Sequence, residues 1–272
     1  MKEVRNILVH YHMFKNAGTT FDSVLEANLG EAFCDHRDDE PMRQQKAPYL
    51  KEFLLANEGL RAISSHHMCT PLPTHPSLRL HRVYFLRNPI ERASSVYRFE
   101  RIQQVETPGA IHAKKYSFRD YVKWRMEPQV PPTIREYQVR TIVGKTRPKL
   151  QMAEKDLLEA LQLARSTPFT GLVEQFDASL ALFKPYMDKL FPGFSFEYER
   201  QNVNEQNVKA PLVSKIAQIA DELGDMYDEL VAANQMDLRL WQYFNDELAV
   251  RQVSLGVAMP ATEITAGEAG SG

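Results

Sequence analysis

A lysine, a glycine and two threonines lie close together between residues 12 and 20. Lys15 supplies a mobile cation, and the hydroxyl groups of Thr19 and Thr20 supply hydrogen-bond donors. Gly18 allows the backbone to approach a bound group closely, because glycine has no side chain. These residue types indicate a site for an anion such as phosphate. The candidate anion-binding residues of this segment are Lys15, Asn16, Ala17, Gly18, Thr19 and Thr20.

This segment connects a predicted strand to a predicted helix. Residues 6–11 are apolar enough to form a strand buried on both faces, and apolar residues recur at helical spacing from Phe21 to a stop at Gly30. A strand, a short turn and a helix together direct backbone N–H groups and the positive end of the helix toward an anion. The alternative is an ordinary strand-to-helix connection with a capping threonine.

A second strand–turn–helix unit is predicted around residue 88. Residues 81–86 have the composition of a strand, which stops before Asn88 and Pro89. Asparagine is a good helix N-cap and proline suits the first helical turn, so a helix is expected over about residues 90–104.

Two arginines and a serine in this second unit could bind another anion. On the predicted helix, Asn88, Arg92 and Ser95 share a face because they are spaced four and three residues apart. Arg87, at the end of the strand, can reach over the same surface. A guanidinium and a hydroxyl that converge in this way predict a second anion pocket. The alternative is that Arg92 only pairs with Glu91 or another nearby carboxylate.

Two adjacent histidines end another predicted strand, over residues 61–66. A histidine near its normal pKa can act as a general base at neutral pH. Ligands of parallel α/β sheets lie at the carboxyl ends of the strands. We therefore expect His66 and His67 to lie on the same edge of the sheet as Lys15 and Arg87.

The alternation of strands and helices predicts an α/β fold with a parallel central sheet and helices on both faces. Residues 34–48 are polar and charged and predict a surface loop, and prolines exclude regular structure from residue 71 to residue 80. Residues 1–249 are expected to form one domain, and residues 250–272 a disordered tail. A strand is predicted at 169–173, and helices at 49–57, 117–126, 136–143, 155–164, 178–190 and over most of 212–247.

The overall composition excludes several classes of protein. The chain has 272 residues and a net charge of only −2, so no general electrostatic field indicates a nucleic-acid partner. Its two cysteines, Cys34 and Cys69, form neither a disulfide framework nor a metal-ligand spacing. No apolar run is long enough to span a membrane, and the first one stops at His10 without a cleavage site. We expect a soluble, cytoplasmic protein with no membrane partner.

Together, the two candidate anion motifs resemble those of sulfotransferases that use 3′-phosphoadenosine-5′-phosphosulfate (PAPS). The likeness is greatest to the carbohydrate family that includes the heparan and dermatan 2-O-sulfotransferases. The 5′-phosphosulfate loop of that family has roughly the sequence His-Ile-Pro-Lys-x-Ala/Gly-Gly/Ser-Thr-Ser/Thr. Residues 12–20 are similar to it, with Phe14 in place of the proline. The 3′-phosphate motif, Arg-Asp-Pro-x-x-Arg-x-x-Ser-x-Tyr, is similar to residues 87–97, with Asn88 in place of the aspartate.

Weaker similarities extend the resemblance over about residues 6–247. They are found at residues 116–122, 137–144, 169–174 and 202–204. The resemblance implies a P-loop-like three-layer domain.

The resemblance also implies a reaction, which is the in-line transfer of a sulfuryl group from PAPS to a hydroxyl group of a carbohydrate or small molecule. Lys15, the loop amides and the threonines would stabilise the leaving 5′-phosphate, and Arg87 and Ser95 would hold the 3′-phosphate. The general base of the family aligns with His67, and a slip of one residue would select His66. No metal is required.

Two other functions are compatible with the same fold. One is a P-loop-type kinase that uses ATP. The absence of a Gly-x-x-x-x-Gly-Lys-Ser/Thr segment and of a carboxylate-rich metal site weakens that hypothesis. The other is a non-catalytic module that binds a nucleotide.

Overall fold

The computed structural model describes residues 4–254, except residues 38, 148 and 199–209. Its centre is a five-stranded sheet in the order β2-β3-β1-β4-β5, and every paired strand is parallel to its neighbour. At the centre, Val9 is paired with Ile63 on one side and with Arg82 on the other. The strands are β1 (Arg5–Tyr11), β2 (Phe33–Asp35), β3 (Ala62–Ser65), β4 (Leu78–Leu86) and β5 (Thr170–Leu172).

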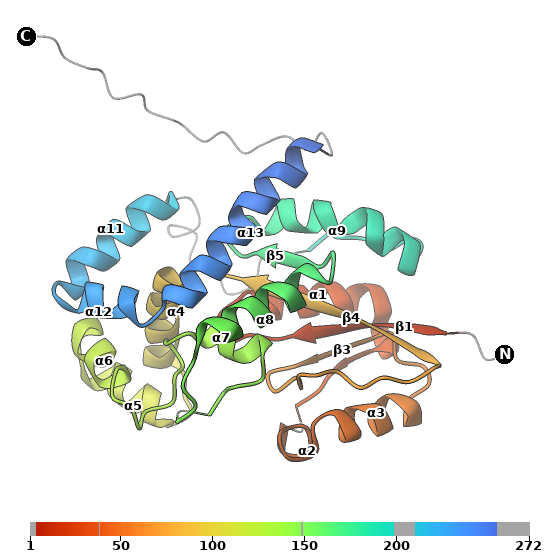
Figure 1. Ribbon diagram of the computed structural model, residues 1–272, viewed down its shortest axis with the longest axis horizontal. Coiled ribbons are helices and arrows are strands. Elements are labelled where there is room, and N and C mark those ends of the chain that lie inside the picture. The colour runs from red at the N-terminus through yellow and green to blue at the C-terminus, as the bar shows by residue number, and fades with distance from the viewer. Residues whose placement is uncertain (1–3, 38, 148, 199–209, 255–272) are drawn as a thin grey trace, which may run out of the picture.

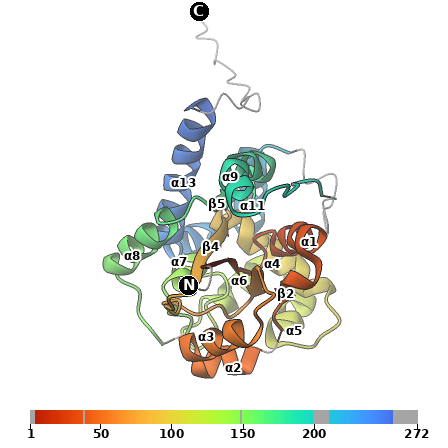
Figure 2. The same cartoon turned by 90° about the vertical axis from the view of Figure 1, so that its right-hand side faces the viewer.

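Helices cover both faces of the sheet, so the predicted three-layer α/β architecture is confirmed. Side chains alternate between the faces of a strand, and Ile7 and Val9 of β1 therefore enter one core while Leu8 enters the other. On the Leu8 side lie α1 (Gly18–Leu29) and α9 (Phe176–Leu190). Figure 2 shows α1 and α8 on opposite sides of the sheet. The Val9 side packs against α3 (Ala47–Ala56), α7 (Tyr137–Ile142), α8 (Glu154–Arg165) and α13 (Gln235–Ser254).

A third apolar core lies beyond the carboxyl edge of the sheet, toward which the β1 arrow points in Figure 1. It is built by α4 (Pro89–Ile102), α5 (Pro108–Lys115), α6 (Phe118–Arg125), α11 (Leu212–Leu223) and α12 (Met226–Ala232). The predicted cap of α4 is confirmed, because the side chain of Asn88 accepts hydrogen bonds from the backbone N–H groups of Ile90 and Glu91. None of the helices in the described residues has the length and apolar character needed to cross a membrane.

Residues 34–48 are not the predicted surface loop. They contain most of strand β2 and helix α2 (Asp39–Gln45), which buries Met42. The strand has only three residues, and its parallel pairing with β3 determines it more than its own composition does. Strand β4 also starts earlier than expected, at Leu78, because its first residues pair with β1 as soon as the prolines end.

The carboxyl-terminal helical region is divided differently from the expectation. Residues 212–247 belong to three helices, and the first of them ends at Gly224, whose φ of 56° takes the chain out of the helical conformation. Helix α13 continues to Ser254, past the boundary at residue 250 that the composition predicted, and buries Gln252. The rest of the predicted tail lies outside the described residues.

Candidate functional site

The connection between β1 and α1 has an unusual backbone conformation. Lys15 and Ala17 have φ values of 64° and 58°. These values lie in the left-handed region, which residues with a Cβ atom rarely adopt. Such residues each cost about 1–3 kcal/mol and cluster at functional sites. Backbone N–H groups next to left-handed residues can converge into a concavity that binds anions. The loop therefore adopts this conformation without glycine at either position.

The amino-terminal end of α1 is open toward this loop. Its N-cap residue is Ala17, and no side chain among the described residues caps the helix. The backbone N–H of Phe21 donates the first hydrogen bond of the helix, to the carbonyl oxygen of Ala17. The N–H groups of residues 18–20 therefore have no acceptor within the helix itself. These groups and the positive end of the helix together favour a bound anion.

Asn16 is buried and holds the loop in place. Its Nδ2 donates hydrogen bonds to the carbonyl oxygen of Phe85, at 2.7 Å, and to Oε1 of Gln138, at 2.8 Å. The amide of Gln138 also bonds both the backbone N–H and the carbonyl oxygen of Arg87, each at 2.8 Å. Gln138 thus connects the first motif to the second. Sequence reasoning placed Gln138 only in a weakly similar segment and did not identify this role.

Arg87 lies directly against the loop, as its position after β4 predicted. Its Nη1 donates to the carbonyl oxygen of Lys15 at 2.9 Å, and its Nε forms an ion pair with Glu91. Arg98 and Lys215 add positive charge near Glu91. Burial would raise the pKa of Glu91, but these cations hold that pKa below its ordinary value. Burial, Arg87 and Arg98 lower the pKa of the Lys15 ammonium. A bound anion would relieve this excess of positive charge.

Arg92 has a different position from Arg87 and is fully buried. Its guanidinium donates to the carbonyl oxygens of Phe14 and Thr133 and lies 4.1 Å from the ring centre of Tyr137. Burial lowers its pKa to about 10. It does not pair with Glu91, which was the alternative to the predicted anion pocket. Glu91 instead forms ion pairs with Arg87, which precedes α4, and with Lys215 of α11. Arg92 therefore fixes the base of the loop to α4.

Ser95 is half-buried, and Thr19 is exposed at the start of α1. By helical spacing Ser95 lies one turn from Glu91 and one turn from Phe99. The Nζ atom of Lys15 lies 4.6 Å from the ring centre of Phe99, so the side chain of Lys15 extends over the face of α4 that carries Ser95.

The two histidines after β3 have different environments. His66 lies against the loop, because its Nδ1 donates to the carbonyl oxygen of His12 at 2.8 Å and the two ring centres are 4.1 Å apart. A carbonyl oxygen can only accept, so the proton of neutral His66 is on Nδ1 and the lone pair is on Nε2. The side chain of His67 is exposed, and its backbone N–H donates to Ser65. The hydrogen bond to His12 therefore fixes the orientation of the His66 ring.

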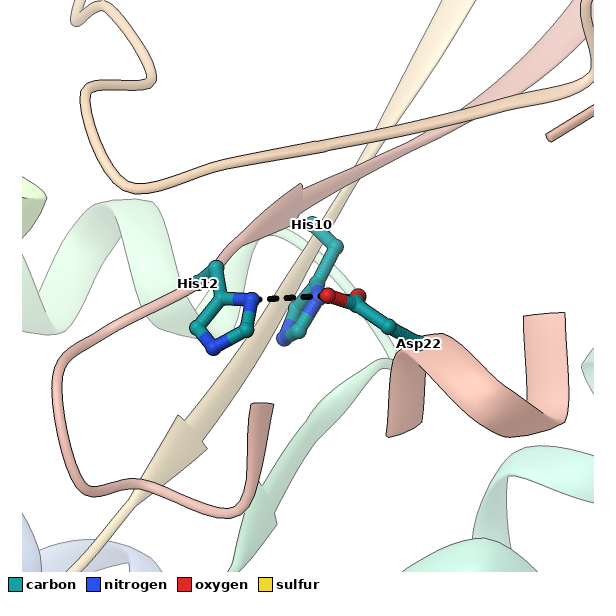
Figure 3. A group of neighbouring side chains, drawn as sticks. All are labelled: His10, His12 and Asp22. Carbon is teal, nitrogen blue, oxygen red and sulfur yellow. Dashed lines mark hydrogen bonds and ion pairs between the residues drawn. The ribbon is translucent and has the colours of Figure 1, made fainter. Parts of the chain in front are cut away.

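Sequence reasoning missed a buried group of two histidines and an aspartate behind the loop (Figure 3). Nδ1 of His10 and Nδ1 of His12 each bond a different carboxylate oxygen of Asp22, at 2.8 and 2.7 Å. Burial opposes ionisation of Asp22, yet the two histidines hold its pKa well below the ordinary value. Burial lowers the pKa of His10. The signal in the sequence was the spacing of two residues between His10, in β1, and His12, directly after it.

These three residues also have the ligand types of a metal site. However, their nitrogen–oxygen distances are those of charge-assisted hydrogen bonds, and each carboxylate oxygen has its own N–H donor. We therefore describe the group as a hydrogen-bonded imidazole–carboxylate–imidazole bridge.

One relative matches most of the chain. The chain is 30% identical over 251 residues to a protein of Archaeoglobus fulgidus that is described as uncharacterized. The alignment covers 88% of this chain and 95% of the archaeal one. The two proteins belong to one family. No protein-family model matches the sequence.

Proposed function

We propose that the protein transfers the sulfuryl group of PAPS to a hydroxyl group of a carbohydrate or small-molecule acceptor. The observation that carries this proposal is the contact between two anion-binding elements that lie far apart in the sequence. The strained loop of Lys15 and Ala17 faces the open end of α1, and Arg87 reaches this loop through the carbonyl oxygen of Lys15. A nucleotide with phosphates at its 5′ and 3′ positions requires two such elements side by side.

The residues present fit such a nucleotide. When bound, PAPS would supply an activated sulfuryl group with the 5′-phosphate as its leaving group. Lys15 and the N–H groups of residues 18–20 would stabilise the charge that develops on that phosphate. Arg87 and Ser95 would hold the 3′-phosphate. Arg87 already pairs with Glu91. When Arg87 binds the 3′-phosphate, the positive charges of Arg98 and Lys215 would help to neutralise the carboxylate of Glu91.

The acceptor hydroxyl must lose a proton during the transfer. His66 is a suitable base, because its hydrogen bond to His12 leaves the lone pair on Nε2. The family resemblance instead aligns the base with His67, whose side chain is exposed and which lies two residues after Ser65, the last residue of β3 that is paired with β1. We favour His66 on geometry and treat His67 as the alternative to be tested.

Incubation with radiolabelled PAPS and a panel of hydroxyl-bearing acceptors tests the proposal. We expect release of the unlabelled nucleotide and label in an acceptor, both without added magnesium. A Lys15→Ala variant, which removes the loop cation, serves as the matched negative control. Transfer of labelled phosphate from magnesium–ATP to the same acceptors would favour the kinase instead.

A further inference from the structure

His12 is held so that one side of its ring faces the loop. Its Nδ1 donates to Asp22, and Figure 3 shows the opposite side of the ring turned toward the β1–α1 connection. A Cβ atom built on Gly18 would lie only 2.3 Å from Nε2 of His12. The ring therefore occupies the space beside the first residue of α1 that any other amino acid would fill.

The Nε2 atom of His12 is available to a ligand, because it is not fully enclosed by protein atoms. The residue is 7% exposed, and within the described part of the chain Nε2 makes no hydrogen bond. A ring nitrogen that makes no hydrogen bond to the protein can form one with a ligand. Here the atom lies next to the uncapped end of α1, where the backbone already favours an anion.

The hydrogen bond to Asp22 determines which nitrogen of the His12 ring can meet an anion. Asp22 on α1 is ionised and accepts the proton of Nδ1, while the rings of His10 on β1 and His66 after β3 lie on either side. Since Asp22 fixes the first proton on Nδ1, a second proton taken from solvent can only go to Nε2. An imidazolium at this position would be stabilised by Asp22 on one side and by a bound anion on the other.

We infer that His12 is a further anion-binding residue of the loop, and that its protonated Nε2 donates a hydrogen bond to an oxyanion held at the start of α1. The inference rests on the proposed function only for the identity of that oxyanion, which would be the 5′-phosphate of the nucleotide. Asp22 is then a positioning residue that orients the ring. Gly18 is required because the ring of His12 occupies the place where a Cβ atom would lie.

Nitrogen NMR of the histidine rings tests this directly in the wild-type protein. Inorganic phosphate is titrated first, and adenosine 3′,5′-bisphosphate is titrated separately. We expect each ligand to move the ¹⁵N chemical shift of His12 Nε2 to the value typical of a protonated ring nitrogen. An Nε2 signal that stays unchanged while calorimetry shows the bisphosphate to be bound would overturn the inference and leave the proposed function intact.

The opposite combination separates the two claims. If phosphate moves the Nε2 signal but the bisphosphate binds no more tightly than AMP, the inference stands and the proposed function fails. If neither phosphate nor bisphosphate binds, the loop is not an anion site and the inference is wrong.

Substitutions give a second, independent readout. His12→Asn keeps an amide donor near the place of Nδ1 and removes Nε2, so we expect phosphate affinity to fall about 10–100-fold. His12→Gln, whose amide can reach the place of Nε2, should lose less. His36→Gln is the matched control, because His36 is also buried and bonds Tyr49 through its own Nε2 at 2.8 Å. Equal phosphate affinity in His12→Asn and His36→Gln would contradict the inference.

Discussion

The guanidinium of Arg87 donates a hydrogen bond from Nη1 to the backbone carbonyl oxygen of Lys15, 2.9 Å away. This bond joins the end of β4 to the loop after β1, two segments that are 72 residues apart in the chain. Because Gln138 bonds the backbone of Arg87 and the side chain of Asn16 at the same time, the two motifs form one hydrogen-bonded unit.

Arg87 and Arg92 should have separable roles. Arg87→Lys keeps a charge beside Glu91 but loses the planar fork that can bond two groups at once. We expect adenosine 3′,5′-bisphosphate to bind about tenfold or more weakly, while AMP, which lacks the 3′-phosphate, is little affected. Arg119→Lys, in a surface ion pair with Asp225, is the control. Equal losses for both nucleotides would argue against a 3′-phosphate contact.

Arg92→Met should instead reduce stability. The change leaves the carbonyl oxygens of Phe14 and Thr133 without their donor in a buried region. We expect the free energy of unfolding to fall by about 2–5 kcal/mol, as measured by denaturant titration. A wild-type unfolding midpoint would show that Arg92 does not hold the loop.

Gly18→Ala should disrupt the loop through a direct clash. The added Cβ would lie 2.2 Å from Cδ2 of the His12 ring, so His12 must leave its place against Asp22. We expect a loss of about 1–3 kcal/mol in thermal or denaturant unfolding, together with loss of nucleotide binding. Gly59→Ala is the matched control, because nothing lies within 4 Å of its Cβ position. Similar effects of the two substitutions would contradict the packing described for Gly18.

Substitution of His66 and His67, one at a time, identifies the base. We expect His66→Gln to lower the turnover of PAPS by about 10²–10⁴-fold with unchanged affinity for the bisphosphate, since a glutamine cannot take the proton. His67→Gln should retain most of the activity. The reverse result would assign the base to His67, as the alignment of the sequence suggested.

The structure also predicts a pH dependence of stability at the start of α7, next to Gln138. The carboxylate of Glu136 accepts the N–H groups of Met236 and Asp237 at the start of α13, and Asp237 in turn caps α7. Burial and the nearby charge of Asp237 raise the pKa of Glu136 from 4.5 to about 7.

The sign of this dependence follows from the raised pKa. The folded state binds the proton more tightly than the unfolded state, so the stabilising contribution of Glu136 is present at low pH and is lost as the pH rises through about 7. We expect the Tm of the wild type, relative to that of Glu136→Gln, to fall between about pH 5 and about pH 8. Parallel Tm curves for the two proteins would contradict the raised pKa.

The layered fold was predictable because its main signals are local. The apolar runs at residues 6–11 and 81–86 and the cap at Asn88 each determine structure within a few residues. Strand β2 was not predictable, since three residues carry little pattern and the pairing partner β3 is distant in the sequence.

The candidate site was predictable in its location but not in its detailed geometry. Lys15 and Ala17 adopt left-handed conformations that neither residue type favours, so no local signal indicates them. The spacing that placed Arg92 and Ser95 on one face could not show that Arg92 is buried. Likewise, only the folded structure brings Asp22 between His10 and His12.

The central claim is that the two motifs form a site for a nucleotide with phosphates at both the 5′ and 3′ positions. Isothermal titration calorimetry with adenosine 3′,5′-bisphosphate and with AMP tests it most directly, because the two ligands differ only in the 3′-phosphate. We predict that the bisphosphate binds at least about tenfold more tightly, without magnesium. Equal affinity for the two nucleotides, or tighter binding of magnesium–ATP, would contradict the claim.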